Sequence, residues 1–222
     1  MRILGAIFDW DGVIIDSEAQ HRRSWDRLAE ETGLPFPRGA FERSFGMRNA
    51  QIIPDILGWA APGDHGEIAR LADRKEALYR EEIRSQGIEA LPGIREFLET
   101  LRQAGIPCAV GSSTSRKNID TVLELTQLSG CFDAIVSAED VSKGKPDPDV
   151  FLRAAERLRV EPAHCVVFED AHVGIEAARR GGMRVVGLAT THPAKSLSAA
   201  DVVTKSLEGW TLESLGQALG VQ

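Results

Sequence analysis

Two pairs of carboxylates follow apolar runs in this sequence and could do chemistry together. Asp9 and Asp11 follow a run that ends at Phe8, and Glu169 and Asp170 follow the run CVVF. Residues two apart on a strand point the same way, so Asp9 and Asp11 would repel one another and lose hydration. A divalent cation would offset this repulsion, and Mg²⁺ takes oxygen ligands. The pairs therefore predict a metal site with a candidate nucleophile and a candidate general acid.

Hydroxyl groups and lysines follow two further apolar runs. Ser112, Ser113 and Thr114 follow IPCAVG, while Lys143 and Lys145 lie in VSAEDVSKGKPDPD, after FDAIVS. A hydroxyl, the backbone amides at a helix N-terminus and a lysine together form a cradle suited to phosphate. The spacing does not choose between the two lysines.

Each of these segments also has a purely structural explanation. DWDG is compatible with a turn, SSTS with a helix cap, KGKPDPD with a solvated loop, and Glu-Asp with the charge favoured at a helix N-terminus. Four such coincidences at the ends of four apolar runs are less expected than one site. The combination predicts metal-assisted phosphoryl transfer through an aspartyl-phosphate.

The elements that carry these residues alternate from Leu91 onward. Short apolar runs (IPCAVG, FDAIVS, HCVVFED, MRVVGLA, DVVT) are separated by amphipathic helical patterns. This alternation predicts a parallel sheet covered by helices on both faces, to which the first apolar run also belongs. Ligands of such sheets bind at the carboxyl ends of the strands, where the polar residues fall.

Residues 17–86 show helical patterns and no strand pattern. The first helix is expected to begin after Ser17 and to end at Gly33, and Pro54 is expected to kink or split a later one. We therefore expect an α/β core formed by residues 1–16 and 88–222 and interrupted by a helical cap, residues 17–87.

Composition narrows the class of protein. The chain has 222 residues, 43% of them hydrophobic, and a formal net charge of −7, which argues against a nucleic-acid partner. Three scattered cysteines indicate a reducing compartment, and no run approaches membrane-spanning length or reads as a signal peptide. We expect a cytoplasmic protein with no membrane partner, either a monomer or a weak homo-oligomer.

The motifs DWDGVIIDSE, VGSSTS, KPDPDVF and FEDAHVGIEAA resemble, in this order, the four motifs of the haloacid dehalogenase-like hydrolases. They are similar in particular to the phosphatase and β-phosphoglucomutase branch, whose helical cap lies between the first two motifs. The resemblance covers essentially the whole chain. It implies a doubly wound, Rossmann-like parallel-sheet core with an inserted α-helical cap.

By this resemblance, Asp9 is the nucleophile and Asp11 is the general acid and base. Asp9, the backbone carbonyl of Asp11 and the carboxylate of Asp170 would bind Mg²⁺, with Glu169 at the metal or just beyond its ligands. Asp11 argues against true dehalogenase chemistry, because the dehalogenases of the family lack that second Asp. Trp10 stands where the family has an aliphatic residue or Phe, and we expect it to pack in the core.

The resemblance also assigns residues that bind the substrate. Ser112 and the amide of Ser113 would hold the transferring phosphoryl group, and Lys145 rather than Lys143 matches the lysine before the Pro-x-Pro pattern.

Cap residues are assigned in the same way. Gly46 matches a cap loop that approaches the substrate, and His21 and Lys75 match cap positions that couple closure to catalysis and bind substrate in the sugar-phosphate mutases. His21 and Lys75 could instead be ordinary exposed helix residues. Mutases of the branch have an arginine at the position of Asn49, for which the adjacent Arg48 could substitute here.

These assignments favour a Mg²⁺-dependent phosphatase acting on a small phosphorylated metabolite, such as a sugar phosphate. A sugar-phosphate mutase of the β-phosphoglucomutase type is the alternative, which Asn49 weakens. A phosphonate hydrolase would need an imine-forming cap lysine, for which Lys75 is the one candidate. A non-enzymatic phospho-accepting protein, like a response-regulator receiver, would lack the large cap and would not release phosphate repeatedly. A protein that keeps the fold but only binds would be expected to have lost Asp9 or Asp11, and both are present.

Overall fold

The computed structural model describes residues 2–44 and 47–220. The chain divides into two compact units. Met1–Asp16 and Glu89–Gln222 form one, termed the core unit, and Ser17–Ile88 form the other, termed the helical unit. Each is described by itself.

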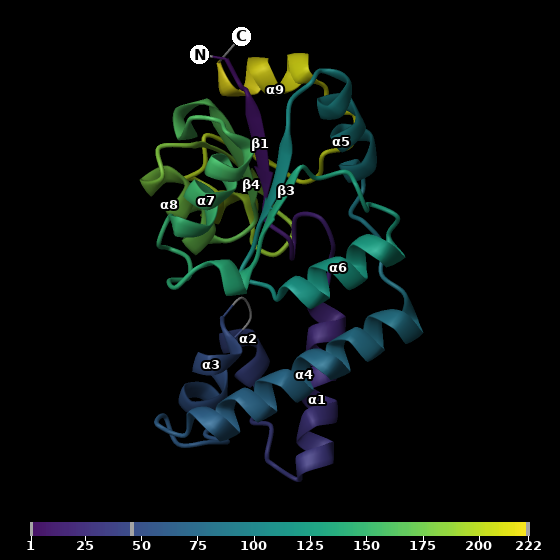
Figure 1. Ribbon diagram of the computed structural model, residues 1–222, viewed down its shortest axis with the longest axis vertical. Coiled ribbons are helices and arrows are strands. Elements are labelled where there is room, and N and C mark those ends of the chain that lie inside the picture. Colours follow the sequence, from purple (N-terminus) through teal and green to yellow (C-terminus); the bar gives the residue numbers. More distant parts are fainter. Residues whose placement is uncertain (1, 45–46, 221–222) are drawn as a thin grey trace. The chain divides into compact units, whose positions relative to one another are not determined.

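Over the described residues, the core unit contains one sheet of six parallel strands in the order β3-β2-β1-β4-β5-β6 (Figure 1). The strands are β1 (Gly5–Phe8), β2 (Cys108–Gly111), β3 (Ala134–Val136), β4 (Cys165–Glu169), β5 (Arg184–Leu188) and β6 (Val202–Thr204). β1, β2 and β4 are buried along their whole length, which explains their continuous apolar sequences. The expectation of a doubly wound parallel sheet is confirmed.

The register of the three central strands brings their carboxyl ends to one level. Phe8 of β1 pairs with Val110 of β2 on one side and with Phe168 of β4 on the other. The residues that follow these positions therefore lie side by side at one edge of the sheet. Asp9 and Glu169 are two of them.

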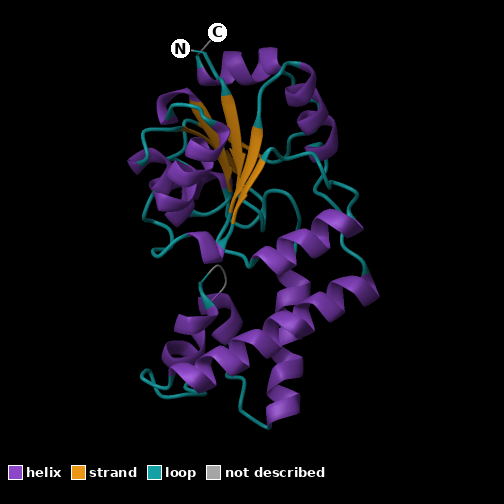
Figure 2. Cartoon of the chain, viewed as in Figure 1, coloured by secondary structure: helices purple, strands orange, loops and turns teal. Residues whose placement is uncertain are grey.

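Helices cover both faces of this sheet, as the purple and orange elements of Figure 2 show. They are α5 (Ile94–Gln103), α6 (Arg116–Leu125), α7 (Asp149–Leu158), α8 (His172–Arg180) and α9 (Leu212–Leu219), with short 3₁₀ turns at Ala138–Asp140, Pro162–His164 and Ala194–Leu197. Ile7 and Val167 pack with α7 and α8 on one face. Phe8 and Phe168 pack against Phe97 of α5 on the other.

The helical unit consists of α1 (Glu18–Thr32), α2 (Ala40–Ser44), α3 (Asn49–Gln51), a π-helical segment η1 (Ile52–Leu57) and α4 (His65–Gln86). α1 ends at Gly33 in the left-handed conformation, as expected. Pro54 lies within η1, so the expected interruption takes the form of a short α-helix followed by a wide π turn. The unit buries its own apolar cluster, which includes Trp25, Leu28 and Leu71.

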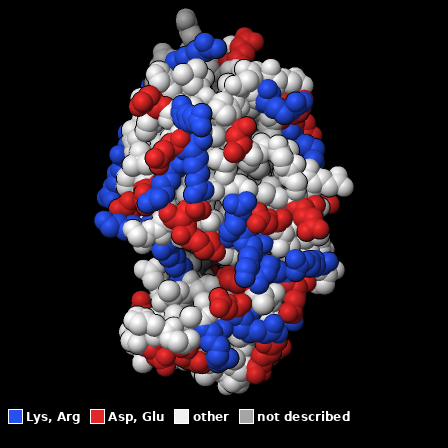
Figure 3. All heavy atoms as spheres, in the orientation of Figure 1, with Lys and Arg blue, Asp and Glu red and all other residues white. Residues whose placement is uncertain are grey.

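Ion pairs join α1 to α4 along their polar faces. Arg27 contacts Glu81 at 2.6 Å and Glu82 at 2.7 Å, and Arg74 contacts Glu31 at 2.6 Å. Basic and acidic side chains are interspersed on the visible face of the molecule in Figure 3. Across residues 2–44 and 47–220, no helix is long and apolar enough to cross a membrane.

Candidate active site

Asp9 is the first residue after β1, and its amide donates to the carbonyl of Phe168 at 2.9 Å. The chain then turns sharply, because Gly12 has a φ of +79° and its amide donates to the carbonyl of Ile15. Position 12 also has no room for a side chain, since a Cβ there would lie 2.1 Å from Asp170 Oδ2. Gly12 thus allows the carboxylate of Asp170 to approach the loop that carries Asp9.

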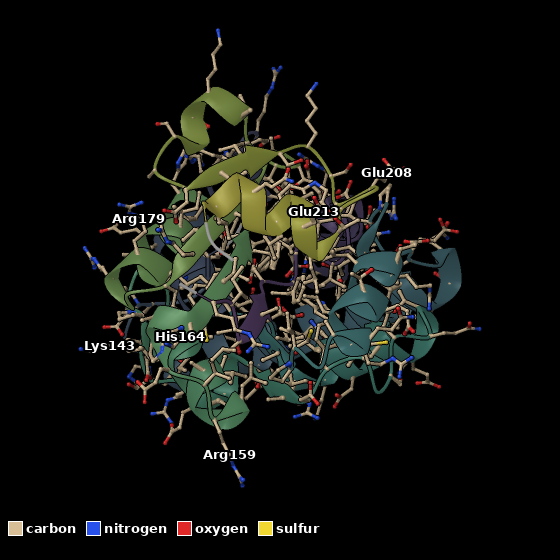
Figure 4. The ribbon with its side chains drawn as sticks, turned by 90° about the horizontal axis from the view of Figure 1, so that it is seen from above. Lys143, Arg159, His164, Arg179, Glu208 and Glu213 are labelled. Atoms are coloured by element: carbon tan, nitrogen blue, oxygen red, sulfur yellow. The ribbon has the colours of Figure 1, made fainter. Side chains whose placement is uncertain are left out.

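Lys145 joins the two carboxylates that end β1 and β4. Its Nζ donates to Asp9 Oδ1 at 2.6 Å and to Glu169 Oε1 at 2.7 Å, and its side chain is 7% exposed. Lys143 is 75% exposed, with its Nζ 3.8 Å from Asp147 Oδ2, and it lies at the margin of the ribbon in Figure 4. The structure therefore brings Lys145, and not Lys143, to Asp9.

Asp9, Glu169 and Asp170 form a buried cluster in which each residue offers one carboxylate oxygen, and these three oxygens lie within 4.8 Å of one another. When ionised, these three carboxylates and the ammonium of Lys145 leave a surplus of two negative charges. A divalent cation would neutralise this surplus. Because the donor atoms are all oxygens, the residues present fit Mg²⁺.

The carboxyl groups of Asp9 and Asp170 in this cluster have raised pKa values. Burial raises the pKa of Asp9 to about 7, an effect that the charge of Lys145 opposes and that of Glu169 reinforces. Burial, with the charges of Glu169 and Asp9, raises the pKa of Asp170 to about 8. Burial of Lys145 acts to lower its pKa, but the two carboxylates that its ammonium contacts raise it. These raised pKa values favour protonation of the cluster near neutral pH, which a bound cation would oppose.

Glu169 has partners for both of its oxygens. Oε1 accepts from Lys145, Oε2 accepts from the amide of Ala171 at 2.6 Å, and the residue is 1% exposed. These contacts hold the Glu169 carboxylate in place within the cluster.

Trp10 is fully buried, as expected from its place in the first motif.

The hydroxyl segment after β2 lies against Asp11. The Ser112 amide donates to the carbonyl of Val136, and its Oγ accepts from the amide of Thr114 at 3.0 Å, across the half-buried Ser113. Thr114 Oγ1 then donates to Asp11 Oδ2 at 2.6 Å. Sequence reasoning named both serines as phosphate ligands and gave no role to Thr114, although it stands in the same motif.

Two further threonines, also missed from the sequence, follow β5. Thr190 Oγ1 donates to the carbonyl of Gly12 at 2.5 Å, and the hydroxyl of Thr191 bonds to the side chain of Asp170, which lowers the pKa of that carboxyl against the effect of burial. Both residues follow the end of a parallel strand. The rule that pointed to the other site residues could therefore have found them.

The helical unit has a polar cluster of its own. Lys75 Nζ lies 2.8 Å from His21 Nδ1 and donates to Glu76 Oε1 at 2.9 Å, and Asn49 Nδ2 donates to the same oxygen at 2.6 Å. The His21 ring stacks on Tyr79 with 4.1 Å between centroids. Lys75 is 3% exposed, so it is not the solvated surface residue considered as an alternative.

Glu76 neutralises the lysine of this cluster. Burial alone would raise the pKa of Glu76, but the charges of Lys75 and His21 and the hydrogen bonds that it accepts lower it to about 2. Sequence reasoning did not single out Glu76, although it is adjacent to Lys75. Gly46, expected in a loop that approaches the substrate, lies outside the described residues.

Comparisons with known proteins place this geometry in a family. A model of the haloacid dehalogenase-like hydrolases matches residues 3–182. The chain is 37% identical over 208 residues to the chloroplastic 5-amino-6-(5-phospho-D-ribitylamino)uracil phosphatase of Arabidopsis thaliana, covering 92% of this chain but 55% of that one. It therefore spans about half the length of that relative.

Two further comparisons cover both proteins almost fully. The chain is 36% identical over 202 residues to the validoxylamine A 7'-phosphate phosphatase of Streptomyces hygroscopicus subsp. limoneus, covering 91% of this chain and 93% of the relative. The crystal structure of β-phosphoglucomutase from Clostridium difficile superposes with a TM-score of 0.84 at 29% identity, covering 98% and 97%. The resemblance drawn from the four motifs is thus confirmed, and the chain belongs to the haloacid dehalogenase-like hydrolases.

Proposed function

We propose that this protein is a Mg²⁺-dependent phosphatase that hydrolyses a small phosphorylated metabolite, with sugar phosphates as the expected class, through an aspartyl-phosphate on Asp9. The contact of Lys145 Nζ with Asp9 and Glu169, beside Asp170 at the carboxyl edge of the sheet, carries the proposal. Phosphatases among the relatives support it.

The proposed reaction has two steps. A carboxylate oxygen of Asp9 attacks phosphorus, the ester P–O bond breaks, and Asp11 gives a proton to the leaving oxygen. Water then attacks the phosphorus of the acyl-phosphate, Asp11 takes a proton from that water, and phosphate leaves as Asp9 is restored. Ser112 and the amide of Ser113 hold the phosphoryl oxygens, and Lys145 counters their charge.

The residues that would hold Mg²⁺ are Asp9, Asp170 and the backbone carbonyl of Asp11. Bound there, the cation would neutralise charge on the phosphoryl group. Glu169 fits a place beside these ligands, because both of its oxygens accept hydrogen bonds already. Its part is to hold Lys145 in place.

The proposal is tested with purified protein, Mg²⁺ and a panel of sugar phosphates and other small phosphomonoesters. We expect repeated phosphate release that EDTA abolishes. In the Asp11→Asn variant, phosphoenzyme should accumulate after a single turnover, because the base that activates water is lost. Phosphate release that is unaffected by EDTA would contradict the metal assignment, and no release from any ester would contradict the phosphatase.

A sugar-phosphate mutase is the second candidate, favoured by the likeness to β-phosphoglucomutase over nearly the whole chain. A mutase intermediate carries two phosphates and needs a second anion site. Asn49, which replaces the arginine of the mutases, is uncharged and bonds to the carboxylate of Glu76. We therefore favour the phosphatase. Conversion of β-glucose 1-phosphate to glucose 6-phosphate, with little phosphate release, would favour the mutase instead, and Asn49→Arg should raise that activity if the missing cation is the cause.

The expectations of a cytoplasmic location and of a monomer or weak homo-oligomer stay predictions from composition. Sedimentation of the purified protein checks the second of them.

A further inference from the structure

Gly174 lies inside α8, where a glycine is unusual because it is a poorer helix former than alanine. The helical backbone there has no positive φ that would call for glycine. Space provides the reason instead. A Cβ on Gly174 would lie 1.7 Å from Glu169 Oε1 and 2.0 Å from Glu169 Cδ. Any other residue at this position must displace the Glu169 carboxylate.

That carboxylate cannot move without breaking contacts on which the site depends. It is buried, and its two oxygens accept from Lys145 Nζ and from the Ala171 amide. The same Nζ donates to Asp9 Oδ1. A side chain at position 174 would therefore act on Asp9 through two intermediates, Glu169 and Lys145.

We propose that Gly174 is a positioning residue whose missing side chain sets the place of the Lys145 ammonium beside Asp9. The motifs that identified the site gave Gly174 no role. The inference rests on the proposed function for its kinetic test, whereas the positions of Glu169 and Lys145 can be measured independently of any activity.

A double-mutant cycle between Gly174→Ala and Glu169→Asp tests the inference. With Glu169 present, Gly174→Ala should lower kcat for p-nitrophenyl phosphate by roughly 10- to 100-fold. Glu169→Asp should also lower kcat, because it withdraws an acceptor from Lys145, but it shortens the side chain by one methylene and so removes the clash. Adding Gly174→Ala to Glu169→Asp should then change kcat by less than about threefold, since the two effects are coupled.

Crystal structures of the variants give a second readout that needs no turnover. In Gly174→Ala, the distance from Lys145 Nζ to Asp9 Oδ1 should increase from its present 2.6 Å. Gly66→Ala in α4 is the matched control, because a Cβ there would come no closer than 3.7 Å, to Asp64 Oδ1. This control should leave kcat unchanged.

Equal losses of kcat from Gly174→Ala in both backgrounds would overturn the inference. So would an unchanged contact between Lys145 and Asp9 in Gly174→Ala. If Gly174→Ala alone does not fold, the double variant should still fold and melt close to Glu169→Asp, and failure of both to fold would also overturn the inference. A wild-type protein without phosphatase activity would refute the proposed function, while the structural comparison would still decide the role of Gly174.

Discussion

Asp9 combines two properties that oppose each other in one carboxylate. Its contact with the Lys145 ammonium favours the charged form, which the proposed attack on phosphorus requires, while burial beside Glu169 and Asp170 favours the neutral form. A cation bound at the cluster would shift this balance toward the charged form. The proposed nucleophile and the candidate metal site are therefore one electrostatic unit.

Asp9→Asn should abolish turnover, with a loss of kcat on the order of 10³-fold or more, because an amide cannot form the acyl-phosphate. The variant should stay folded, since it removes one negative charge from a cluster of three carboxylates that lies beside a single ammonium. Phosphate release and thermal unfolding without metal measure the two effects. Full activity in this variant would refute the assignment of the nucleophile.

Lys145→Ala leaves the three carboxylates without a buried cation. We expect the free energy of unfolding to fall by about 3–5 kcal/mol, as when one partner of a buried ion pair is removed, together with most of the activity. Lys143→Ala is the matched control two residues away and should change stability by less than about 0.5 kcal/mol, because its side chain is exposed. Urea unfolding of both variants measures the difference, and equal losses would contradict the assignment of Lys145.

The hydroxyl of Thr114 donates to one oxygen of Asp11, the proposed general acid and base. Thr114→Val keeps the shape of the side chain but removes the donor, so we expect kcat to fall by roughly tenfold, within the range for a lost orienting contact. Thr114→Ser keeps the hydroxyl and should recover most of this loss. Equal kcat values for Thr114→Val and Thr114→Ser would contradict an orienting role for the Thr114 hydroxyl.

At the scale of elements, an aromatic cluster fixes the strands that carry the carboxylates. The rings of Phe8 and Phe168 stack with 4.6 Å between centroids, and Phe97 of α5 meets both edge-on. β1 and β4 are thereby held in register next to Asp9 and Glu169. The aromatic cluster therefore contributes both to the stability of the core unit and to the geometry of the candidate site.

Phe97→Ala should lower the free energy of unfolding by about 3–5 kcal/mol, because it leaves a cavity under β1 and β4. Leu152→Ala on α7 removes a side chain whose residue is 37% exposed and should cost much less. Chemical denaturation of the two variants compares them directly. A loss of similar size in both would argue that the cluster is not a main source of stability.

The sequence sufficed to predict the elements and the edge of the sheet where the polar residues gather. Buried parallel strands are continuous apolar runs, and CAVG and CVVFE are indeed strands β2 and β4. Pro54 predicted a break in a helix, and the structure shows that the break is a π turn. The type of turn depends on packing within the helical unit, which a local sequence pattern does not predict.

The contacts between side chains were beyond sequence reasoning. Lys143 and Lys145 lie two residues apart in one loop, and their spacing did not distinguish them. The resemblance to a known motif favoured Lys145, but the contact of its ammonium with Asp9 depends on the path of the chain after β3. Thr191 lies 21 residues after Asp170, and its hydroxyl reaches that carboxylate because β4 and β5 are neighbours in the sheet. Such pairs depend on strand order, which the pattern of apolar runs does not specify.

For the molecule as a whole, the carboxylate cluster makes stability depend on pH. The pKa values of Asp9 and Asp170 rise to about 7 and about 8, from about 3.9 in an unfolded chain. Between these limits the folded protein binds more protons than the unfolded protein, so without metal its stability should fall as pH rises from about 4 to about 8. Thermal unfolding in EDTA between pH 5 and 8.5 checks the sign, and Asp170→Asn should flatten the slope.

Mg²⁺ should remove this loss, because it takes the place of the protons. At a hundredfold excess over its Kd it would add about 2.7 kcal/mol. For a protein of this size, that corresponds to a rise of roughly 5–10 °C in Tm. The rise should be larger at pH 8 than at pH 6, and a rise that does not depend on pH would contradict the cluster as the binding site.

The place of β1 in the middle of the sheet has a consequence for synthesis on the ribosome. β1 ends at Phe8, but its two neighbours are β2 (Cys108–Gly111) and β4 (Cys165–Glu169), far downstream. At roughly 5–20 residues per second, an emerging strand of four apolar residues waits roughly 10 to 30 s for the second of them. The helical unit, whose contacts are local in sequence, can fold during that delay. Nascent chains arrested before β4 emerges should therefore protect α1 and α4 from protease while β1 stays open to chaperones.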